Sequence, residues 1–291
     1  ASVSLSASSN SSGIKSESTN QAVALDNEEK RWLSEQGTFT LGVDPSWAPF
    51  EFIDEEGVYS GIGSSYVDLV GSRLGITLTP ETGLSWAAVL DKVRAGEIDI
   101  LPTVARSSER EKYLNFSKPY ISFPMVITTR KDAPFVDSLA GLNGKKVGVV
   151  RGYITQELIE TNQKGIHVVP VQTLSEGLKQ LNDGKLDAFI DNLLTITHEI
   201  DRSNLDDLKI ASQTKYKFEL SMAVRKGLPE LVPILNKALS TMNEHERAAI
   251  VNSWTAIQIS YGVDTKTILL WGVPLAIGAI LILLILSKYY R

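Results

Sequence analysis

The sequence predicts an α/β fold on parallel sheets, followed by one C-terminal transmembrane helix. Short apolar runs alternate with segments of helical apolar spacing, which is typical of parallel strands joined by helices that cover both faces of a sheet. With 291 residues and 43% apolar content, the chain is long enough to bury a real core. Residues 267–286 carry no charge, and a helix of that length spans about 30 Å, the thickness of a bilayer's hydrocarbon core.

The flanks of residues 267–286 favour a membrane segment over the alternative, a buried core helix. Trp271 lies near one end and Tyr289 follows the other, as aromatic residues do at membrane interfaces. Lys288 and Arg291 come after the segment, which places the C-terminus in the cytoplasm. We therefore expect the rest of the chain to be exported, after removal of a signal peptide.

Composition excludes several functions. The net charge of −5 and the lack of a long basic block argue against nucleic acid as a partner. The chain has no cysteine, so disulfide and thiol chemistry are excluded. His167, His198 and His245 are scattered and form no metal-ligand cluster, and His198 fits a packed or capped helix position. We expect no metal, no cofactor and no catalytic residue.

Local patterns predict the elements up to residue 104. Residues 1–24 are rich in Ser and Asn, which predicts disorder. Asp26 is an N-cap candidate, and Trp47, between two prolines, is expected on a stiff, exposed loop. In order, we expect a helix at 26–36, a strand at 38–43, a loop at 44–52, a turn at 57–61, a helix at 66–74, a strand at 76–79, a helix at 86–94 and a strand at 98–104.

The stretch at 103–120 points to a bound anion. Small polar residues at 107–109 open one or two helical turns, whose free N–H groups and dipole favour negative charge. Arg110 is always charged and can bind a carboxylate through two parallel hydrogen bonds. The alternative is an ordinary capped helix, with Arg110 paired to Glu109, Glu111 or water.

Two motifs carry a family resemblance. The pattern T-x-A-x-x-x-E-R at 103–110, followed by N-F-S-K-P-Y at 115–120, resembles family 3 extracellular solute-binding proteins, the two-lobed Venus flytrap modules that bind polar amino acids. The run at 119–132 is similar to the versions built into bacterial membrane sensors, such as histidine kinases and diguanylate cyclases. The resemblance covers residues 26–255.

The resemblance implies a two-lobed fold of the periplasmic-binding-protein type II, with crossings between the lobes at 123–130 and 217–225. The implied organisation is a disordered segment at 1–24, lobe 1 at 25–124 with 218–257, lobe 2 at 125–217, a linker at 258–266, the transmembrane helix at 267–286 and a cytoplasmic stub at 287–291. The elements expected after the first crossing are a strand at 146–150, a helix from about 155, a strand at 168–171, a helix at 175–182, an extended segment at 186–192, and helices at 229–240 and 244–255.

The resemblance also implies a ligand site between the lobes. Trp47 is expected to form an aromatic wall, with lobe packing as the alternative. Trp86 either caps its helix or lines the cleft with Leu84. The implied ligand-binding residues are Asp44, Trp47, Leu84, Thr103, Ala105, Arg110, Gly152, Tyr153, Ile154 and Asn192.

Two of these positions depart from the family pattern. Amino-acid-binding members place an acid for the ligand's ammonium where this chain has Asn192, and an amide cannot neutralise an ammonium. Asp191 precedes it and is expected to point to the other side of an extended segment. Ala105 stands where members often offer a hydroxyl. The carboxylate half of the site is thus kept and the ammonium half is altered, with Asp44 or Glu51 as sources of the missing charge.

The implied function is that of an extracytoplasmic ligand-sensing domain of a bacterial signal-transduction receptor. A small carboxylate-bearing, amino-acid-like ligand would enter the cleft, and lobe closure would signal through a single pass of the inner membrane, with the binding domain in the periplasm or extracellular space. The alternatives on this fold are the substrate-binding component of an amino-acid uptake transporter, and an enzyme such as a dehydratase or transglycosylase. A homodimer through the membrane segment and a kinase or cyclase output domain are left open.

Overall fold

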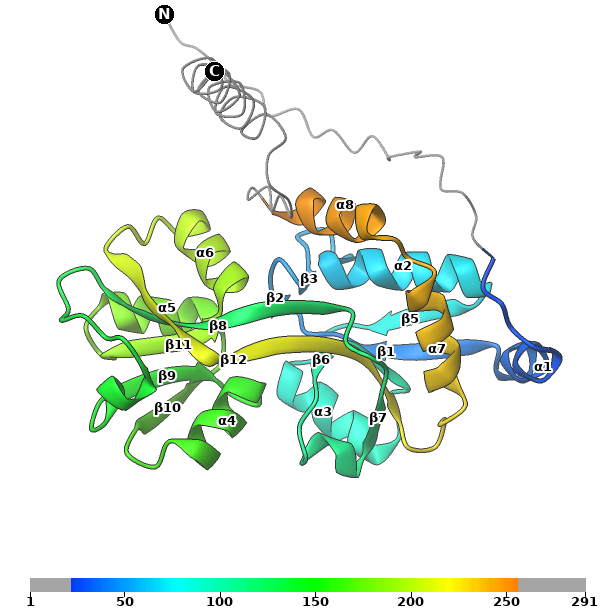
Figure 1. The fold of residues 1–291 in the computed structure, drawn as a ribbon, viewed down its shortest axis with the longest axis horizontal. Coiled ribbons are helices and arrows are strands. Elements are labelled where there is room, and N and C mark those ends of the chain that lie inside the picture. The colour runs from blue at the N-terminus through cyan, green and yellow to red at the C-terminus, as the bar shows by residue number, and fades with distance from the viewer. Residues whose placement is uncertain (1–21, 256–291) are drawn as a thin grey trace, which may run out of the picture. The chain divides into compact units, whose positions relative to one another are not determined.

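The computed structural model describes residues 22–255, and those up to Ile250 belong to one compact unit. Figure 1 shows two groups of helices and strands in this unit, connected by the long strands β8 (Ile121–Arg130) and β12 (Leu208–Arg225). The two-lobed α/β architecture predicted from the sequence is therefore confirmed.

One nine-stranded sheet continues through both lobes in the order β10-β9-β11-β8-β12-β6-β1-β5, with β7 paired to β12. Within lobe 1, β1 is parallel to β5 and β6. Within lobe 2, β9 is parallel to β10 and β11. The parallel pairs explain the alternation of strands and helices along the chain, because parallel neighbours need a crossover connection.

The lobes are connected where β8 and β12 run antiparallel to each other. Phe123 pairs with Phe218, and Pro124 with Lys217. The predicted lobe boundaries, 124/125 and 217/218, fall at these pairs. The register between the two strands shifts between Gln213 and Lys217, so the ladder is irregular on the lobe 2 side of the crossing.

Among residues 22–250, lobe 1 contains those before the first crossing and those after the second. Its elements are α1 (Asn27–Gln36), β1 (Thr38–Gly42), β2 (Ser46–Trp47), β3 (Glu51–Ile53), β4 (Tyr59–Ser60), α2 (Ile62–Leu74), β5 (Thr77–Glu81), α3 (Trp86–Ala95), β6 (Ile100–Ala105), the 3₁₀ turn η1 (Arg110–Lys112), β7 (Leu114–Phe116) and α7 (Leu231–Ser240). The helix α8 (Glu244–Trp254) follows α7.

Lobe 2 contains the chain between the crossings. Its elements are the 3₁₀ turn η2 (Leu139–Leu142), β9 (Lys146–Val150), α4 (Ile154–Asn162), β10 (His167–Val171), α5 (Leu174–Asn182), β11 (Ala188–Asn192) and α6 (Leu193–Arg202).

Local chemistry sets the helix ends of lobe 1. Asp26 caps α1 and forms a capping box with Glu29. Ser85 caps α3 by accepting from the Ala88 N–H, and Gly96 ends the helix in the left-handed conformation. These ends fix the start of α3 at Trp86, which lies at the junction of the lobes.

Each lobe has its own apolar core. In lobe 1 it includes Val89 and Leu90 of α3 with Leu101 of β6. In lobe 2, α5 packs so closely on β11 that a Cβ at Gly177 would lie 2.1 Å from the Phe189 ring. Only glycine allows that approach, which holds α5 against the strand that leads into the site.

Some elements differ from expectation. The segment 44–60 forms the small sheet β2-β3-β4 where a loop and a turn were predicted, and Trp47 is buried rather than exposed. Helix α2 begins at Ile62, four residues before the predicted start. Strand β12 has 18 residues, about twice the predicted length. Polar residues alternate through its first half, and so it lacks the apolar run that predicts a strand.

The predicted linker, transmembrane helix and cytoplasmic stub, at 258–291, lie outside the described residues, as does the predicted disordered segment up to residue 21. Within residues 22–255, no helix has the length and apolarity needed to cross a membrane.

Candidate ligand-binding site

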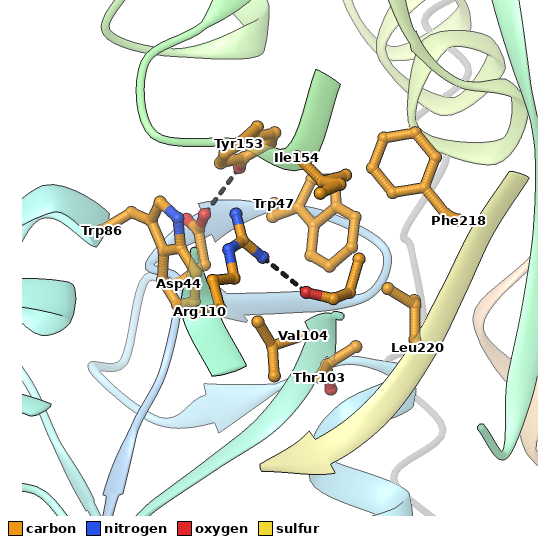
Figure 2. A pocket seen from close by; sticks show the side chains of 11 residues that line it. Asp44, Trp47, Trp86, Thr103, Val104, Arg110, Tyr153, Ile154, Phe218 and Leu220 are labelled. Carbon is orange, nitrogen blue, oxygen red and sulfur yellow. Dashed lines mark hydrogen bonds between the residues drawn. The ribbon is translucent and has the colours of Figure 1, made fainter. Parts of the chain in front are cut away.

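A small cavity lies where β2, β6, α3 and β12 meet the beginning of α4 (Figure 2). Its volume is about 20 Å³, which is room for about one water molecule. The residues that line it are Asp44, Trp47, Trp86, Thr103, Val104, Ala105, Arg110, Tyr153, Ile154, Phe218 and Leu220. Both lobes contribute to the lining, and therefore their relative position determines its size.

The structure brings most of the predicted site residues to this cavity. Those that line it are Asp44, Trp47, Thr103, Ala105, Arg110, Tyr153 and Ile154. Leu84, Gly152 and Asn192 are not among the lining residues. Phe218 and Leu220 line it without having been predicted. Their spacing of two on a strand, which puts both side chains on one face, is the signal that could have found them.

Arg110 makes three hydrogen bonds at the edge of the cavity. Its Nη1 donates to the Ala105 carbonyl at 2.9 Å, and its Nη2 donates to the Gly152 carbonyl at 3.0 Å. Its Nε donates to Glu157 Oε1, also at 3.0 Å. The side chain is only 3% exposed, and burying a guanidinium without such partners is costly. Two of these bonds cross from lobe 1 to lobe 2.

The alternative pairing of Arg110 with Glu109 or Glu111 is wrong for this conformation. Both carboxylates form ion pairs with other basic side chains of the same segment. The expected helical turns are reduced to η1, and the Arg110 N–H donates to Ser107 Oγ at 3.2 Å. So short a turn has little dipole, and the anion-binding character therefore rests on the Arg110 side chain.

Trp86 and Gly152 form a second contact between the lobes. Trp86 Nε1 donates to the Gly152 carbonyl at 3.2 Å, so this carbonyl accepts from both Trp86 and Arg110. Gly152 has φ +78°, a conformation that glycine adopts without strain. Trp86 lines the cavity, whereas Leu84 packs against the lobe 1 core. Trp86 packs against the same core as well, so both expectations for Trp86, packing at the start of its helix and lining the cleft, fit the structure.

Trp47 packs against aromatic rings of both lobes. Its ring centroid lies 4.6 Å from that of Phe50, 5.6 Å from that of Tyr153 and 6.0 Å from that of Phe218. Trp47 thus both lines the cavity and packs the lobes together, which were the two alternatives from sequence. Figure 2 shows Trp47 between Tyr153 and Phe218.

Asp44 connects lobe 1 to lobe 2 through Tyr153. The Tyr153 hydroxyl donates to Asp44 Oδ2 at 2.6 Å, and the Ser46 N–H donates to Oδ1 at 2.8 Å. Burial raises the pKa of Asp44 to about 6, although both hydrogen bonds favour the ionised form.

Two further acids, Glu51 and Asp191, are also buried. Burial raises the pKa of Glu51 to about 8, against the hydrogen bond it accepts from Tyr59 at 2.7 Å. Burial also raises the pKa of Asp191 to about 8, with a smaller contribution from the charge of Asp44. None of the ion pairs within residues 22–255 includes these three carboxyls. Of the two acids proposed for the missing ammonium partner, Asp44 lines the cavity and Glu51 does not.

Asp191 and Asn192 form the buried end of β11. Asp191 is fully buried, and its Oδ1 accepts from the Asn192 N–H at 2.7 Å. Its Oδ2 has no hydrogen-bond partner among the described residues. Asn192 caps α6, because its Oδ1 accepts from the Leu194 N–H at 2.8 Å. Neither residue lines the cavity, so the expectation that Asp191 points away from the site stays a prediction.

Tyr153→Phe removes the hydrogen bond between the lobes at Asp44 while keeping the ring. We expect the free energy of unfolding to fall by about 1–3 kcal/mol, because a buried carboxyl loses its donor. Urea denaturation measures the change, and Tyr216→Phe on the half-buried part of β12 is the control. Equal stability of Tyr153→Phe and the unmodified chain would mean that this bond does not hold the lobes.

The donor set does not fit a metal centre. Within residues 22–255, no group of three or more His, Asp or Glu residues is arranged to hold a metal ion. His198, on α6, is half-buried, and burial lowers its pKa, as expected for a packed histidine. The site instead combines one arginine, one buried acid and aromatic walls, which is the chemistry of a small polar ligand with an apolar body.

Residues 39–257 match the family described as bacterial extracellular solute-binding proteins, family 3. The chain is 28% identical over 227 residues to the virulence sensor protein BvgS of Bordetella pertussis, covering 78% of this chain and 18% of that protein. It is 26% identical over 216 residues to the L-cystine-binding protein TcyJ of Escherichia coli K12, covering 73% and 80%. The chain therefore spans about a fifth of the length of the sensor.

Solved structures share the fold. The periplasmic VFT2 domain of Bordetella pertussis BvgS superimposes with a TM-score of 0.71 at 28% identity, covering 80% of this chain and 99% of that domain. An ancestral arginine-binding protein bound to arginine gives a TM-score of 0.68 at 27% identity, covering 76% and 99%. The family and these neighbours are solute-binding or sensor domains rather than enzymes, which confirms the expectation for this segment.

Proposed function

Because the chain belongs to the bacterial extracellular solute-binding proteins, family 3, we propose that it is the ligand-sensing domain of a membrane-anchored bacterial receptor. The proposed ligand is a small, carboxylate-bearing, amino-acid-like molecule that binds between the lobes, outside the cytoplasm. Opening and closing of the lobes is the proposed signalling motion, passed to the membrane through the segment after Thr255.

The observation that carries this proposal is the position of Arg110. It is a buried, permanently charged guanidinium at the junction of the lobes, and it already holds a carboxylate, that of Glu157, at 3.0 Å. A ligand carboxylate at the same place would receive the same charge-assisted hydrogen bonds. Trp47, Tyr153 and Phe218 would contact the body of the ligand, and Asp44 would face a positive group. The roles of Leu84, Gly152 and Asn192 stay predictions.

Two features support a membrane receptor. BvgS is named as a sensor, and the matched part of it is a periplasmic domain. The uncharged run at 267–286 supplies a membrane anchor directly after the domain, in a single pass of the inner membrane with the C-terminus in the cytoplasm. A cytoplasmic output domain belongs to the same proposal, as does pairing of two copies through the membrane segment.

A transporter's binding component is the second candidate, because the chain covers 80% of TcyJ, a cystine-binding protein. The membrane anchor distinguishes the two. A receptor of the proposed kind stays with the membrane fraction after washing at high pH, whereas a free binding protein is released.

A thermal-shift screen of the 291-residue chain tests the ligand class. The panel contains amino acids, including L-arginine and L-cystine, their deaminated acids and small dicarboxylates. At 100 times Kd, a ligand that binds only the folded state stabilises it by about 2.7 kcal/mol, which is a measurable shift in Tm. We expect stabilisation by at least one carboxylate.

The outcome also tells how the ligand's amine is recognised. Stabilisation by amino acids assigns the ammonium to buried acids such as Asp44. Stabilisation only by acids that lack the amine means that the ammonium half of the site is lost. No stabilisation by any carboxylate contradicts the proposed ligand class.

A further inference from the structure

Glu157 occupies the place that the proposed function gives to the ligand carboxylate. It lies on α4 of lobe 2 and reaches Arg110 of lobe 1, 47 residues away along the chain. Its side chain is 31% exposed, against 3% for Arg110. Glu157 therefore approaches the guanidinium from the solvent side, and this pairing can be exchanged without unfolding either lobe.

Three other bonds hold the lobes together around this pair. Arg110 Nη2 and Trp86 Nε1 both donate to the Gly152 carbonyl. Tyr153, the N-cap residue of α4, donates to Asp44. All of these partners in lobe 2 lie in the segment from Gly152 to Glu157, so a single short stretch of lobe 2 makes the polar contacts to lobe 1.

In this conformation the cavity beside these contacts is too small for an amino acid. Its 20 Å³ accommodates about one water molecule. A ligand can therefore reach Arg110 only if the lobes separate and Glu157 leaves the guanidinium. Because a buried arginine is costly to leave unpaired, exchanging one carboxylate for another is the favourable route.

We propose that Glu157 is a built-in competitor for the carboxylate site, which holds the lobes closed on each other until a ligand displaces it. In this scheme the ligand does not close an open cleft. It opens a domain that already rests closed by displacing Glu157 from Arg110, and so the ligand-dependent change begins at α4. The displacement of Glu157 by a ligand rests on the proposed function, whereas the closed resting state of the lobes does not.

The scheme makes Glu157 a determinant of affinity. A site that is available only in a fraction of molecules binds with an apparent affinity reduced by that fraction. Removing the competing charge raises this fraction. Glu157→Gln keeps the size of the side chain and removes its charge, so it is expected to bind carboxylates roughly tenfold more tightly, a change of about 1.4 kcal/mol.

The distance between the lobes tests the closed resting state without any ligand. The chain has no cysteine, and therefore Ala95→Cys at the end of α3 and Thr161→Cys on α4, both exposed, can be spin-labelled specifically. Pulsed EPR on the 291-residue chain in nanodiscs then measures the separation of the two helices. We expect one short distance in the otherwise unmodified chain, and a longer or broader distribution with Glu157→Gln.

Glu160→Gln is the matched control. Glu160 lies one turn further along α4, is exposed and accepts from Gln156 rather than from lobe 1. The same loss of charge there should leave the distance unchanged. Circular dichroism melting of each variant confirms that it is folded. In a chain that already carries Arg110→Gln, adding Glu157→Gln should leave the distance between the helices unchanged. Glu157 has then already lost its partner.

The results separate the two proposals. A long distance in the ligand-free, otherwise unmodified chain overturns the closed resting state. A short distance that Glu157→Gln does not change overturns the role of Glu157. Affinity is measured by calorimetry with L-arginine and L-cystine as probes. If neither the unmodified chain nor the variant binds any carboxylate of the thermal-shift panel, the proposed function fails, while the distance measurement still decides whether Glu157 holds the lobes.

Discussion

Arg110→Ala is expected to remove most of the affinity for a carboxylate ligand. The guanidinium is the only basic group that lines the cavity in the part of the chain that the structure describes, and truncating one partner of a buried charge pair costs about 2–5 kcal/mol of binding free energy. Calorimetric titration with a stabilising amino acid measures this as a loss on the order of 30- to several thousandfold in Kd.

The same variant should also be less stable without ligand. The Ala105 and Gly152 carbonyls lose their donors, and Glu157 loses its partner. Because Glu157 is partly exposed and can turn to water, we expect a loss of a few kcal/mol at most in the free energy of unfolding.

Two variants control this experiment. Arg106→Ala removes an exposed charge from the same segment, where it pairs with Glu111 at 3.5 Å, and should leave binding unchanged. Arg110→Lys keeps the charge but not the planar fork, and should recover only part of the affinity. Unchanged binding by a folded Arg110→Ala protein would reject Arg110 as the carboxylate anchor.

The partner of Arg110 shows what the sequence could not predict. The motif around residue 110 identified a carboxylate-binding arginine, because its residue types and spacing are local. Its pairing with Glu157 depends on how two lobes dock, and the two residues belong to different lobes. Spacing along the chain therefore favoured nearby acids such as Glu109 and Glu111, which find other partners on the surface.

The strands show the same difference: a local sequence pattern predicts some of them, and others form only through their pairing with other strands. Strand β9 has the predicted bounds, 146–150, because a buried apolar run ends at an arginine and a glycine. Strands β2, β3 and β4 have two or three residues each and are too short for a periodic pattern. Their pairing with one another, rather than any local preference, makes them strands.

The sequence pattern also could not decide how Asp191 and Asn192 lie relative to the cleft. Alternation in an extended segment tells that neighbours point to opposite faces, but not which face meets the cleft. Strand β11 is central in the sheet, paired on one side with β9 and on the other with β8, and all five of its residues are buried. At its end, Asn192 turns to cap α6, and Asp191 is left buried beside the charge of Asp44.

The buried acids should make the folded state less stable as the pH rises. The pKa of Asp191 is about 8 in the folded protein against an ordinary value of 3.8. Below pH 4 the carboxyl is protonated in both states and costs nothing. Between about pH 4 and 8 the unfolded chain ionises while the folded protein keeps the proton, and the free energy of unfolding falls by about 1.4 kcal/mol per pH unit for this group.

Glu51 should act in the same direction between its ordinary value of 4.5 and about 8, and Asp44 between 3.8 and about 6. Other groups oppose them, since hydrogen bonds lower the pKa of Asp26 and Asp54, and burial lowers that of His198. The difference between a variant and the unmodified chain is therefore more informative than the pH profile of either alone.

Asp191→Asn isolates the contribution of one acid. The amide oxygen can still accept from the Asn192 N–H, while the ionisable group is gone. We expect the variant to gain stability relative to the unmodified chain by about 1.4 kcal/mol per unit as the pH rises from about 4 to 8, and to be the more stable of the two at pH 8. Urea denaturation at pH 5, 6, 7 and 8 measures it, with Asp201→Asn on the exposed side of α6 as control.

The pH dependence of that difference separates titration from packing. A buried amide lacking a partner for its Nδ2 destabilises by a constant amount, because it has no proton to gain or lose. Parallel profiles for Asp191→Asn and the unmodified chain would therefore show that Asp191 ionises freely in the folded protein. A stability difference that changes with pH would place a proton on Asp191 at neutral pH, near Asp44. A ligand's ammonium that approaches these acids would then favour release of that proton, and binding would strengthen as the pH rises from 6 to 8.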